Sequence, residues 1–254
     1  MNLTIKYYVR TCGDRELHSS LQQINYELLE DPDHQFAKIF PDQLRQIAAK
    51  NVDGGVVLLE DDVILCRDFK NRIEQVIQER PKDLINFFTN PLTCFKSGYY
   101  IDFCYNQCTY IPFSMLNPMA DYFEHVIKTK DFRWTPERLM YCYFKNFGIK
   151  HYCYRPCLVQ HIDDRSLIGN NLRNDRRTPY FIDYLDDLGI TYEEAIESEE
   201  LTTKLMEMMF DQFAEIDANK NRYNRKFIKI FVKRCMKYKT EAKPIDCSST
   251  KLTK

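Results

Sequence analysis

The segment 56–63 constrains the fold more than any other part of the chain. Four apolar residues that start at Val56 end abruptly in three adjacent carboxylates, Glu60, Asp61 and Asp62. An apolar run that follows a glycine pair predicts a strand buried on both faces, as in a parallel sheet. Ligands of open α/β sheets bind beyond the carboxyl ends of the strands, so we expect the three acids at a ligand site.

Two interpretations of the acidic triplet remain open at this point. Three adjacent carboxylates repel one another and are costly to bury unless a cation offsets their charge. A hard divalent cation, Mg²⁺ or Mn²⁺, accepts oxygen ligands and can bridge to the phosphates of a substrate. The competing interpretation is a solvated turn, because acids at a strand end often cap the next helix.

The composition is that of an ordinary globular chain. The 254 residues allow one large domain with an appendage, or two small domains, and the net charge of −1 gives the whole molecule no strong field. The 10 cysteines stand singly without a Cys-x-x-Cys pair, which favours buried, reduced thiols over a zinc site. No apolar run reaches membrane-spanning length and we expect no signal peptide, so the expected location is the cytoplasm.

Strands and helices alternate along the first part of the chain. Apolar spacing predicts strands at 3–9, 56–59, 84–88, 108–113 and 149–154. It predicts helices at 17–28, 44–48, 69–77, 116–127 and 136–147. This alternation predicts an α/β fold with a mixed, mostly parallel sheet flanked by helices.

The charge pattern divides the rest of the chain. The polar and basic stretch 164–182 is expected to form a loop over the site. From Asp183 to Asp217 there are 12 acidic residues and one basic residue, and from Asn219 to Lys243 there are 10 basic residues and one acidic residue. We therefore predict three parts, namely a domain at 1–182, a helical appendage at 183–243 and a disordered tail at 244–254.

His161 is the second candidate ligand. It follows a predicted strand and an apolar pair and precedes Asp163 and Asp164. Neutral imidazole binds Mn²⁺-class metals alongside carboxylates. Although His161 lies about a hundred residues after the acidic triplet, the sheet topology can place both at the same carboxyl edge.

These features together resemble a known family. The pattern Val-Leu-Leu-Glu-Asp-Asp-Val at 57–63 is similar to the variant Asp-x-Asp motif of family-25-like sugar transferases. The segment Pro-Cys-Leu-Val-Gln-His-Ile at 156–162 resembles that of the N-acetylglucosaminyltransferase IV-like group. Small phage-encoded glycosyltransferases combine such features. The resemblance covers roughly 3–165 and implies a GT-A-like, Rossmann-like fold.

The resemblance also implies how a nucleotide-sugar donor, most simply a UDP-sugar, would be held. By likeness to the family motif, Asp62 is the best metal ligand and Glu60 the second acid. Asp61 would face the ribose or the donor sugar, and His161 would be a late ligand to the metal or the diphosphate. The Mn²⁺ or Mg²⁺ ion would act as a Lewis acid on the leaving diphosphate.

An inverting transferase also needs a base that takes the proton of the acceptor hydroxyl. Our candidate is Glu137, in the first turn of the helix that Thr135 opens, where inverting enzymes of the GT-A fold often carry an acid. An acid there also simply complements the helix dipole. Asp163 and Asp164 are rival candidates, and a retaining mechanism would need no such base.

The turn after the first strand is the candidate nucleotide-binding loop. In the GT-A fold this loop holds the base and ribose, which implicates Arg10, Thr11 and Arg15. Either arginine is a candidate for the diphosphate, since guanidinium matches phosphate geometry. Arg165 is a further phosphate candidate. The plain alternative is that Arg15 is a solvated residue of the next helix.

The acceptor is left open by the sequence. The basic helix at 219–243 either pairs with the acidic stretch before it or contacts phosphates, and a phage enzyme in the host cytoplasm would then act on hydroxymethylated pyrimidines in DNA. A glycan or cell-surface acceptor is the alternative. Two other functions compete with sugar transfer, namely a metal-dependent phosphodiesterase or nuclease and a non-enzymatic nucleic-acid-binding module. The oligomeric state is not predicted.

Overall fold

A computed structural model describes residues 3–50, 54–89, 96–101, 103, 106–130, 134–162, 177–216 and 225–241. The nine strands within these ranges are β1 (Ile5–Thr11), β2 (Tyr26–Glu30), β3 (Gly55–Glu60), β4 (Val63–Leu65), β5 (Ile85–Asn86), β6 (Gly98–Tyr100), β7 (Cys108–Pro112), β8 (His151–Cys153) and β9 (Val159–His161). The helices are the 3₁₀ turn η1 (Ser19–Gln23), α1 (Phe40–Ala49), α2 (Phe69–Glu79), α3 (Phe113–Thr129), α4 (Pro136–Phe147), α5 (Ile182–Leu188), α6 (Tyr192–Glu197), α7 (Glu199–Ile216) and α8 (Arg225–Glu241).

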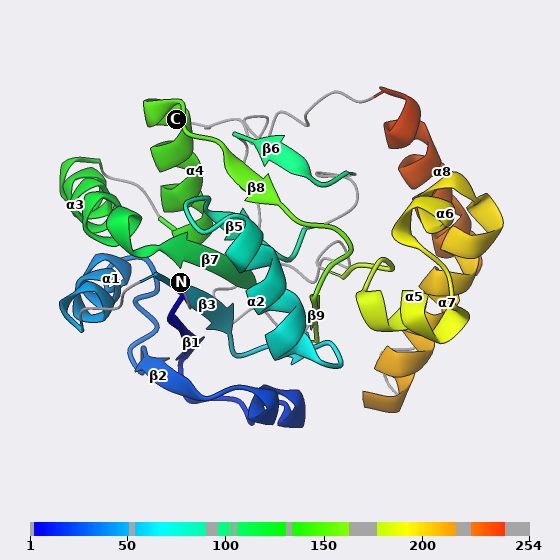
Figure 1. Ribbon diagram of the computed structural model, residues 1–254, viewed down its shortest axis with the longest axis horizontal. Coiled ribbons are helices and arrows are strands. Elements are labelled where there is room, and N and C mark those ends of the chain that lie inside the picture. Colours follow the sequence, from blue (N-terminus) through cyan, green and yellow to red (C-terminus); the bar gives the residue numbers. More distant parts are fainter. Residues whose placement is uncertain are drawn as a thin grey trace.

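A seven-stranded mixed sheet forms the centre of the molecule, in the order β2-β1-β3-β7-β5-β8-β6 (Figure 1). The strands β2, β1, β3, β5 and β8 point the same way, whereas β7 and β6 run antiparallel to their neighbours. Strands β4 and β9 form a separate antiparallel pair. The predicted α/β class with a mostly parallel sheet is therefore confirmed.

The sheet is buried on both faces, as the apolar run in β3 predicts. Val57 and Leu59 point into one hydrophobic cluster, together with α2. Val56 and Leu58 point into the other, together with α1, α3 and α4. The alternation follows from the two-residue period of a strand, and it leaves the end of β3 as the first place where this strand can meet solvent.

The helix predicted over 17–28 is wrong. The chain instead forms the short turn η1 and then β2, which pairs in parallel with β1. The apolar spacing fits a helix, but Leu28 is 45% exposed and so belongs to no buried stripe. Hydrogen bonding along the free edge of β1 decides the conformation here, and a single-segment pattern does not contain that information.

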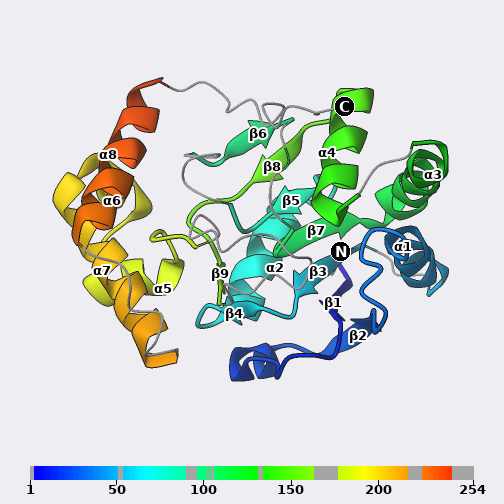
Figure 2. The same cartoon turned by 180° about the vertical axis from the view of Figure 1, so that it is seen from behind.

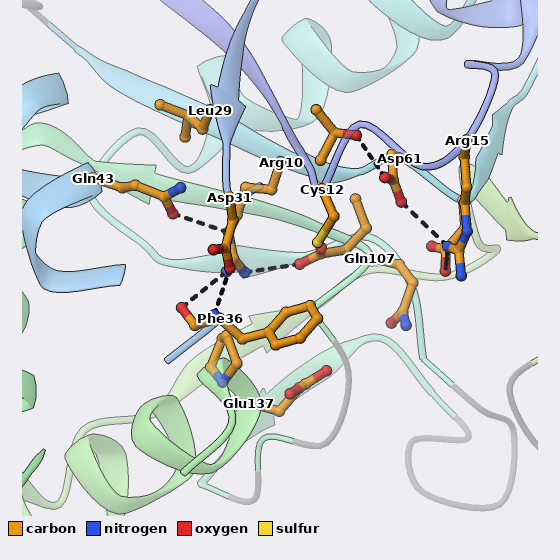
Figure 3. Close-up of a pocket in the computed structure, with 14 residues that line it drawn as sticks. Arg10, Cys12, Arg15, Leu29, Asp31, Phe36, Gln43, Asp61, Gln107 and Glu137 are labelled. Carbon is orange, nitrogen blue, oxygen red and sulfur yellow. Dashed lines mark hydrogen bonds and ion pairs between the residues drawn. The ribbon is translucent and has the colours of Figure 1, made fainter. Parts of the chain in front are cut away.

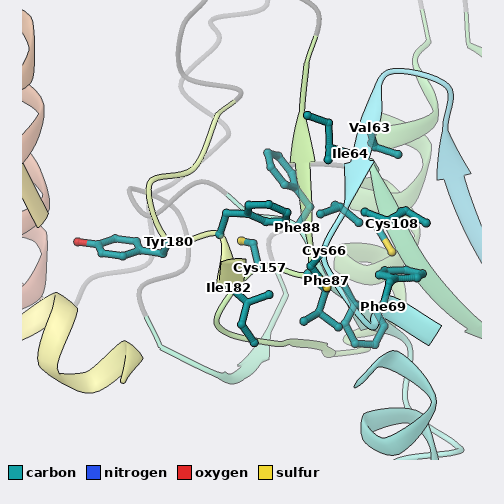
Figure 4. Close-up of a cluster of buried hydrophobic side chains, with 14 of the residues drawn as sticks. Val63, Ile64, Cys66, Phe69, Phe87, Phe88, Cys108, Cys157, Tyr180 and Ile182 are labelled. Atoms are coloured by element: carbon teal, nitrogen blue, oxygen red, sulfur yellow. The ribbon is translucent and has the colours of Figure 1, made fainter. Parts of the chain in front are cut away.

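The helices of the appendage pack onto the same hydrophobic cluster as α2. Figures 1 and 2 show α5 to α8 gathered at one side of the molecule, opposite α1 and α3. The cluster runs from Cys66 and Phe87 through Cys157 and Tyr180 to Leu205 of α7 (Figure 4). Two ion pairs of 2.7 Å, from Arg67 to Asp187 and from Arg72 to Asp186, join α5 to the start of α2.

Other local predictions on the described residues are confirmed. Thr135 caps α4, and Gly148 ends it with a positive φ of 63°. The capping box of Thr191 and Glu194 begins α6. The described cysteines are free thiols, most of them buried. No helix in the described parts of the chain is long and apolar enough to cross a bilayer.

Candidate functional site

An open pocket lies at the carboxyl ends of β2, β1 and β3, where the sequence predicts a ligand (Figure 3). Its empty space, including the mouth that opens to solvent, is about 690 Å³. The walls come from strand ends, the 12–15 turn, the 31–36 loop, α1, the residue before β7 and the first turn of α4. The lining residues are Arg10, Thr11, Cys12, Arg15, Leu29, Asp31, Phe36, Gln43, Glu60, Asp61, Asp62, Gln107, Pro136 and Glu137.

Glu60 ends β3 and is held by two neighbours. Its Oε1 accepts hydrogen bonds of 3.0 Å from Arg10 Nη1 and 3.0 Å from Asn106 Nδ2. Arg10 is buried, donates from Nε to Gln43 at 3.2 Å and lies 4.6 Å from the ring centroid of Phe40. These contacts make Arg10 a partner of Glu60 within the protein, whereas the sequence offered it as a phosphate ligand.

Asp61 and Asp62 share a second arginine. Arg15 Nη1 lies 3.2 Å from Asp61 Oδ1 and 2.7 Å from Asp62 Oδ2. The other oxygen of Asp61 accepts a 2.8 Å hydrogen bond from the Thr11 hydroxyl. The candidate nucleotide-binding loop thus approaches the acidic triplet directly, and two guanidinium groups neutralise part of its charge.

His161 is brought next to the triplet by the pairing of β9 with β4, in which it lies opposite Val63. Its Nε2 is 3.1 Å from Asp62 Oδ2, and its side chain is 2% exposed. The ring lies behind Asp62 and does not line the pocket. Within the described parts of the chain, both ring nitrogens and Asp62 Oδ1 are buried without a hydrogen bond of good geometry. Such atoms usually call for a bound water or ion.

The electrostatics of the pocket are strongly negative. Five carboxyl groups line it against the guanidinium groups of Arg10 and Arg15, a balance of −3 when all are ionised. Burial raises the pKa of Glu60 to about 7; Arg10 opposes this rise, and nearby carboxylates, Glu137 first among them, add to it. Burial would also raise the pKa of Asp62, but His161 and Arg15 outweigh it and hold that pKa below its usual range.

The side chains are of the types that bind a divalent cation, but they are not arranged as a complete metal site. No three His, Cys, Asp or Glu side chains among the described residues lie close enough together to hold a metal. The 3.1 Å between Asp62 Oδ2 and His161 Nε2 is nonetheless about the spacing of two neighbouring ligands at roughly 2.1 Å from one ion. Arg15, which lines the pocket, contacts both Asp61 Oδ1 and Asp62 Oδ2.

The structure brings most of the predicted site residues together. Glu137, predicted as the base, lies in the pocket with the triplet, from the first turn of α4. Arg165 and the rival bases Asp163 and Asp164 lie outside the described residues.

Sequence reasoning missed one wall of the pocket. Asp31 accepts hydrogen bonds from the backbone N–H groups of Gln35 and Phe36, at 2.8 and 2.5 Å, and so shapes the loop that carries Phe36. Gln43 and Gln107 complete the wall. The available signal was the pair Asp31-Pro32, which is typical of a structured turn. Because a helix was predicted over 17–28, this pair was interpreted as the end of that helix.

Comparisons with known proteins do not show which family the chain belongs to. No family model and no curated protein matches it. Among solved structures, it is similar to the "Crystal Structure of A197 from STIV", with a TM-score of 0.42 and 13% identity over 64% of this chain and 87% of that one. A TM-score of this size carries no argument about fold or function.

Proposed function

We propose that this protein is a metal-dependent glycosyltransferase with a GT-A-like fold, which moves a sugar from a nucleoside diphosphate sugar to an acceptor hydroxyl. One observation carries the proposal, namely that the triplet Glu60, Asp61 and Asp62 shares a pocket with Glu137 at the carboxyl ends of parallel strands. The strand ends supply the acidic groups from one side, and α4 supplies a separate carboxylate from the other.

The charge of the pocket supports a need for a cation. A lining with five carboxyl groups and two arginines repels a diphosphate, since like charges at short range in a protein interior cost several kcal/mol. A divalent cation removes that repulsion. Asp62, Glu60 and His161 would hold it, and when bound it supplies Lewis-acid stabilisation of the leaving diphosphate.

The remaining lining residues fit distinct tasks. Thr11 and Arg15 hold Asp61 in place for the ribose or the donor sugar. Leu29 and Phe36, which also line the pocket, offer apolar surface to a nucleobase. Glu137, in the first turn of α4, takes the proton from the acceptor hydroxyl while the hydroxyl oxygen bonds to the sugar and the diphosphate leaves.

We further propose that the acceptor is a polyanion such as modified DNA, held through α8. Lys229, Lys233 and Arg234 are exposed on this helix, whereas Val232 and Cys235 are buried against the appendage. Among the described residues, these three basic side chains form no ion pair with the acidic helix α7. Their charge is therefore available to phosphates. A glycan acceptor remains the alternative.

The direct test is a thermal-unfolding panel with UDP, GDP and UDP-sugars, each with and without Mn²⁺. We expect a nucleoside diphosphate to raise the unfolding temperature when Mn²⁺ is present, since ligands that bind the folded state stabilise it. Asp62→Asn should abolish this rise, while Asp42→Asn, the same change on the exposed face of α1, should keep it. A rise that is independent of Mn²⁺, or that survives in Asp62→Asn, would contradict the metal assignment.

A further inference from the structure

We propose that Gln107 determines the specificity of the pocket for a sugar, because its side-chain amide holds a hydroxyl group of the donor sugar. The inference rests on the proposed function, since it concerns the sugar part of the same donor. It goes beyond that function by naming the residue that distinguishes a nucleotide-sugar from the nucleoside diphosphate alone.

The sheet places Gln107 beside the acidic triplet. Gln107 directly precedes β7, which runs antiparallel to β3. Its backbone oxygen accepts a 3.2 Å hydrogen bond from the N–H group of Glu60, the last residue of β3. The side chain lines the pocket, and in the view of Figure 3 it lies between Arg15 and Glu137. A ligand that reaches both the triplet and Glu137 therefore passes Gln107.

The amide oxygen of Gln107 is free to bind a ligand. The residue is 3% exposed, and its Oε1 is buried with no hydrogen-bond partner in the described parts of the chain. The second glutamine of the pocket lining differs, because Gln43 Oε1 accepts from Arg10 Nε at 3.2 Å and arginine can only donate. That contact fixes the amide of Gln43. The amide of Gln107 can instead turn about its last side-chain bond and offer its oxygen or its NH₂ group to a ligand.

The charges around Gln107 select the chemistry of that ligand. Glu60 and Glu137 line the same pocket, and their carboxylates repel the oxygens of a phosphate. A cation would bind the carboxylates and leave the NH₂ group of the amide without an acceptor. A hydroxyl group is neutral, accepts from the NH₂ group and donates to a carboxylate or to the amide oxygen. A sugar ring carries several such groups, so a sugar matches an amide set among acids.

The test is calorimetric titration of the full chain with Mn²⁺ present throughout. From a panel of UDP-glucose, UDP-galactose, UDP-N-acetylglucosamine and GDP-mannose, the donor that binds the wild type most tightly is compared with its own nucleoside diphosphate. Gln107→Met keeps the length of the side chain and removes both hydrogen-bonding groups. We expect it to raise the ratio of the two dissociation constants, donor over nucleoside diphosphate, about five- to tenfold, as for the loss of one or two neutral hydrogen bonds. The nucleoside diphosphate itself should bind within about twofold of its wild-type affinity, since it lacks the sugar. Gln75→Met, the same change at an exposed position of α2, is the matched control and should keep the wild-type ratio.

Donors that lack a single sugar hydroxyl separate a direct contact from a structural effect. The deoxy donor without the hydroxyl that Gln107 holds should bind the wild type and Gln107→Met with nearly equal affinity, whereas the other deoxy donors should keep the difference. A difference of the same size for every deoxy donor would overturn the inference. An unchanged ratio in Gln107→Met would also overturn it, while bound nucleoside diphosphate would leave the proposed function standing. If the wild type binds neither a nucleoside diphosphate nor a donor, the proposed function fails and the inference falls with it. If Gln107→Met does not fold, Gln107→Ala removes the same two groups and should change the ratio equally.

Discussion

Glu60 and Glu137 line the same pocket from two different elements, β3 and α4. Glu60 is fixed by Arg10 and Asn106 at the end of β3, whereas Glu137 stands in the first turn of α4. Burial is the main cause of the raised pKa of Glu60, and the nearby Glu137 carboxylate adds to that rise. Two acids held by different elements can act on different substrates, one on the donor and the other on the acceptor.

At the residue scale, we therefore predict that Glu137→Gln lowers the rate of transfer at least about a hundredfold, within the usual range for the loss of a general base. Donor affinity should change less than about threefold, because the base acts on the acceptor and not on the nucleotide. Steady-state kinetics with a separate donor-binding titration measures both quantities. An unchanged rate would transfer the role to another acid or indicate a retaining mechanism.

A second residue-scale prediction concerns pH. His151 is 1% exposed and packs against the rings of Phe103 and Phe144, at 5.1 and 5.2 Å. Burial lowers the pKa of His151 to about 3, against about 6.5 in an unfolded chain. Between these values the unfolded state binds a proton that the folded state does not. Stability therefore falls as pH drops below about 6.5, by roughly 1.4 kcal/mol per pH unit.

The variant His151→Gln removes the titrating group. Its free energy of unfolding, measured by urea denaturation at pH 7 and pH 5, should fall less over this interval than that of the wild type. His125→Gln, at an exposed position of α3, provides the control and should leave the pH dependence unchanged. Parallel pH dependence in wild type and His151→Gln would show that the ring is not buried in the neutral form.

At the scale of the element, β9 is held by the side-chain amide of Gln160, which hydrogen-bonds to a neighbouring backbone as another strand would. Gln160 is fully buried, donates from Nε2 to Thr178 O at 2.7 Å and accepts at Oε1 from Thr178 N at 3.0 Å. The amide thus ties β9 to the chain that leads into α5. It fixes the strand that places His161 behind Asp62.

We predict that Gln160→Met lowers the free energy of unfolding by about 3 kcal/mol, because it leaves buried backbone groups of Thr178 without partners. Urea denaturation measures the change, and Gln22→Met at an exposed position is the control. A loss below about 1 kcal/mol would mean that water replaces the amide.

How far the elements could be predicted depended on where their hydrogen bonds lie. The bounds of α4 are set by Thr135 and Gly148, which act within the helix, and the sequence predicts them well. The unbroken apolar run likewise predicts that β3 is buried on both faces. Strand β2 could not be predicted in this way, since it depends on the free edge of β1, and the apolar spacing before it is equally good for a helix.

The same distinction applies to the candidate site. Its acids follow one another in sequence, so their place at a strand end could be predicted, whereas the choice of Glu137 came from the resemblance to inverting transferases of the GT-A fold. The contacts of Arg10 and Arg15 could not be predicted, because a phosphate and a carboxylate attract a guanidinium group equally well. Which of the two an arginine meets depends on three-dimensional distances that spacing does not encode.

At the scale of the whole molecule, the near-zero net charge conceals an uneven distribution. Lys229, Lys233 and Arg234 are exposed on α8, and Figure 1 shows α8 on the side of the molecule opposite α1, whose Gln43 lines the acidic pocket. A polyanion would be repelled by the pocket and attracted by α8. This separation suits an acceptor that is held at a distance and presents one hydroxyl to Glu137.

We predict that changing Lys229, Lys233 and Arg234 together to Gln weakens binding to double-stranded DNA. The slope of log affinity against log salt should become shallower by about 2 to 3, or roughly 0.9 for each phosphate that a basic side chain no longer neutralises. Lys70, Lys82 and Lys150, exposed elsewhere, are changed together to Gln as the control. Equal slopes in both triple variants would contradict DNA binding through α8 and favour an uncharged glycan or a small molecule as the acceptor.

The pairing of β4 with β9 also has a consequence for how the protein is made. Val63 and His161 lie opposite each other, yet roughly a hundred residues separate them along the chain. At about 5–20 residues per second, a ribosome releases the acidic triplet some 5–20 s before the strand that stands behind it. During that interval the nascent chain carries Glu60, Asp61 and Asp62 without His161, so any metal captured early would be held by carboxylates and water alone.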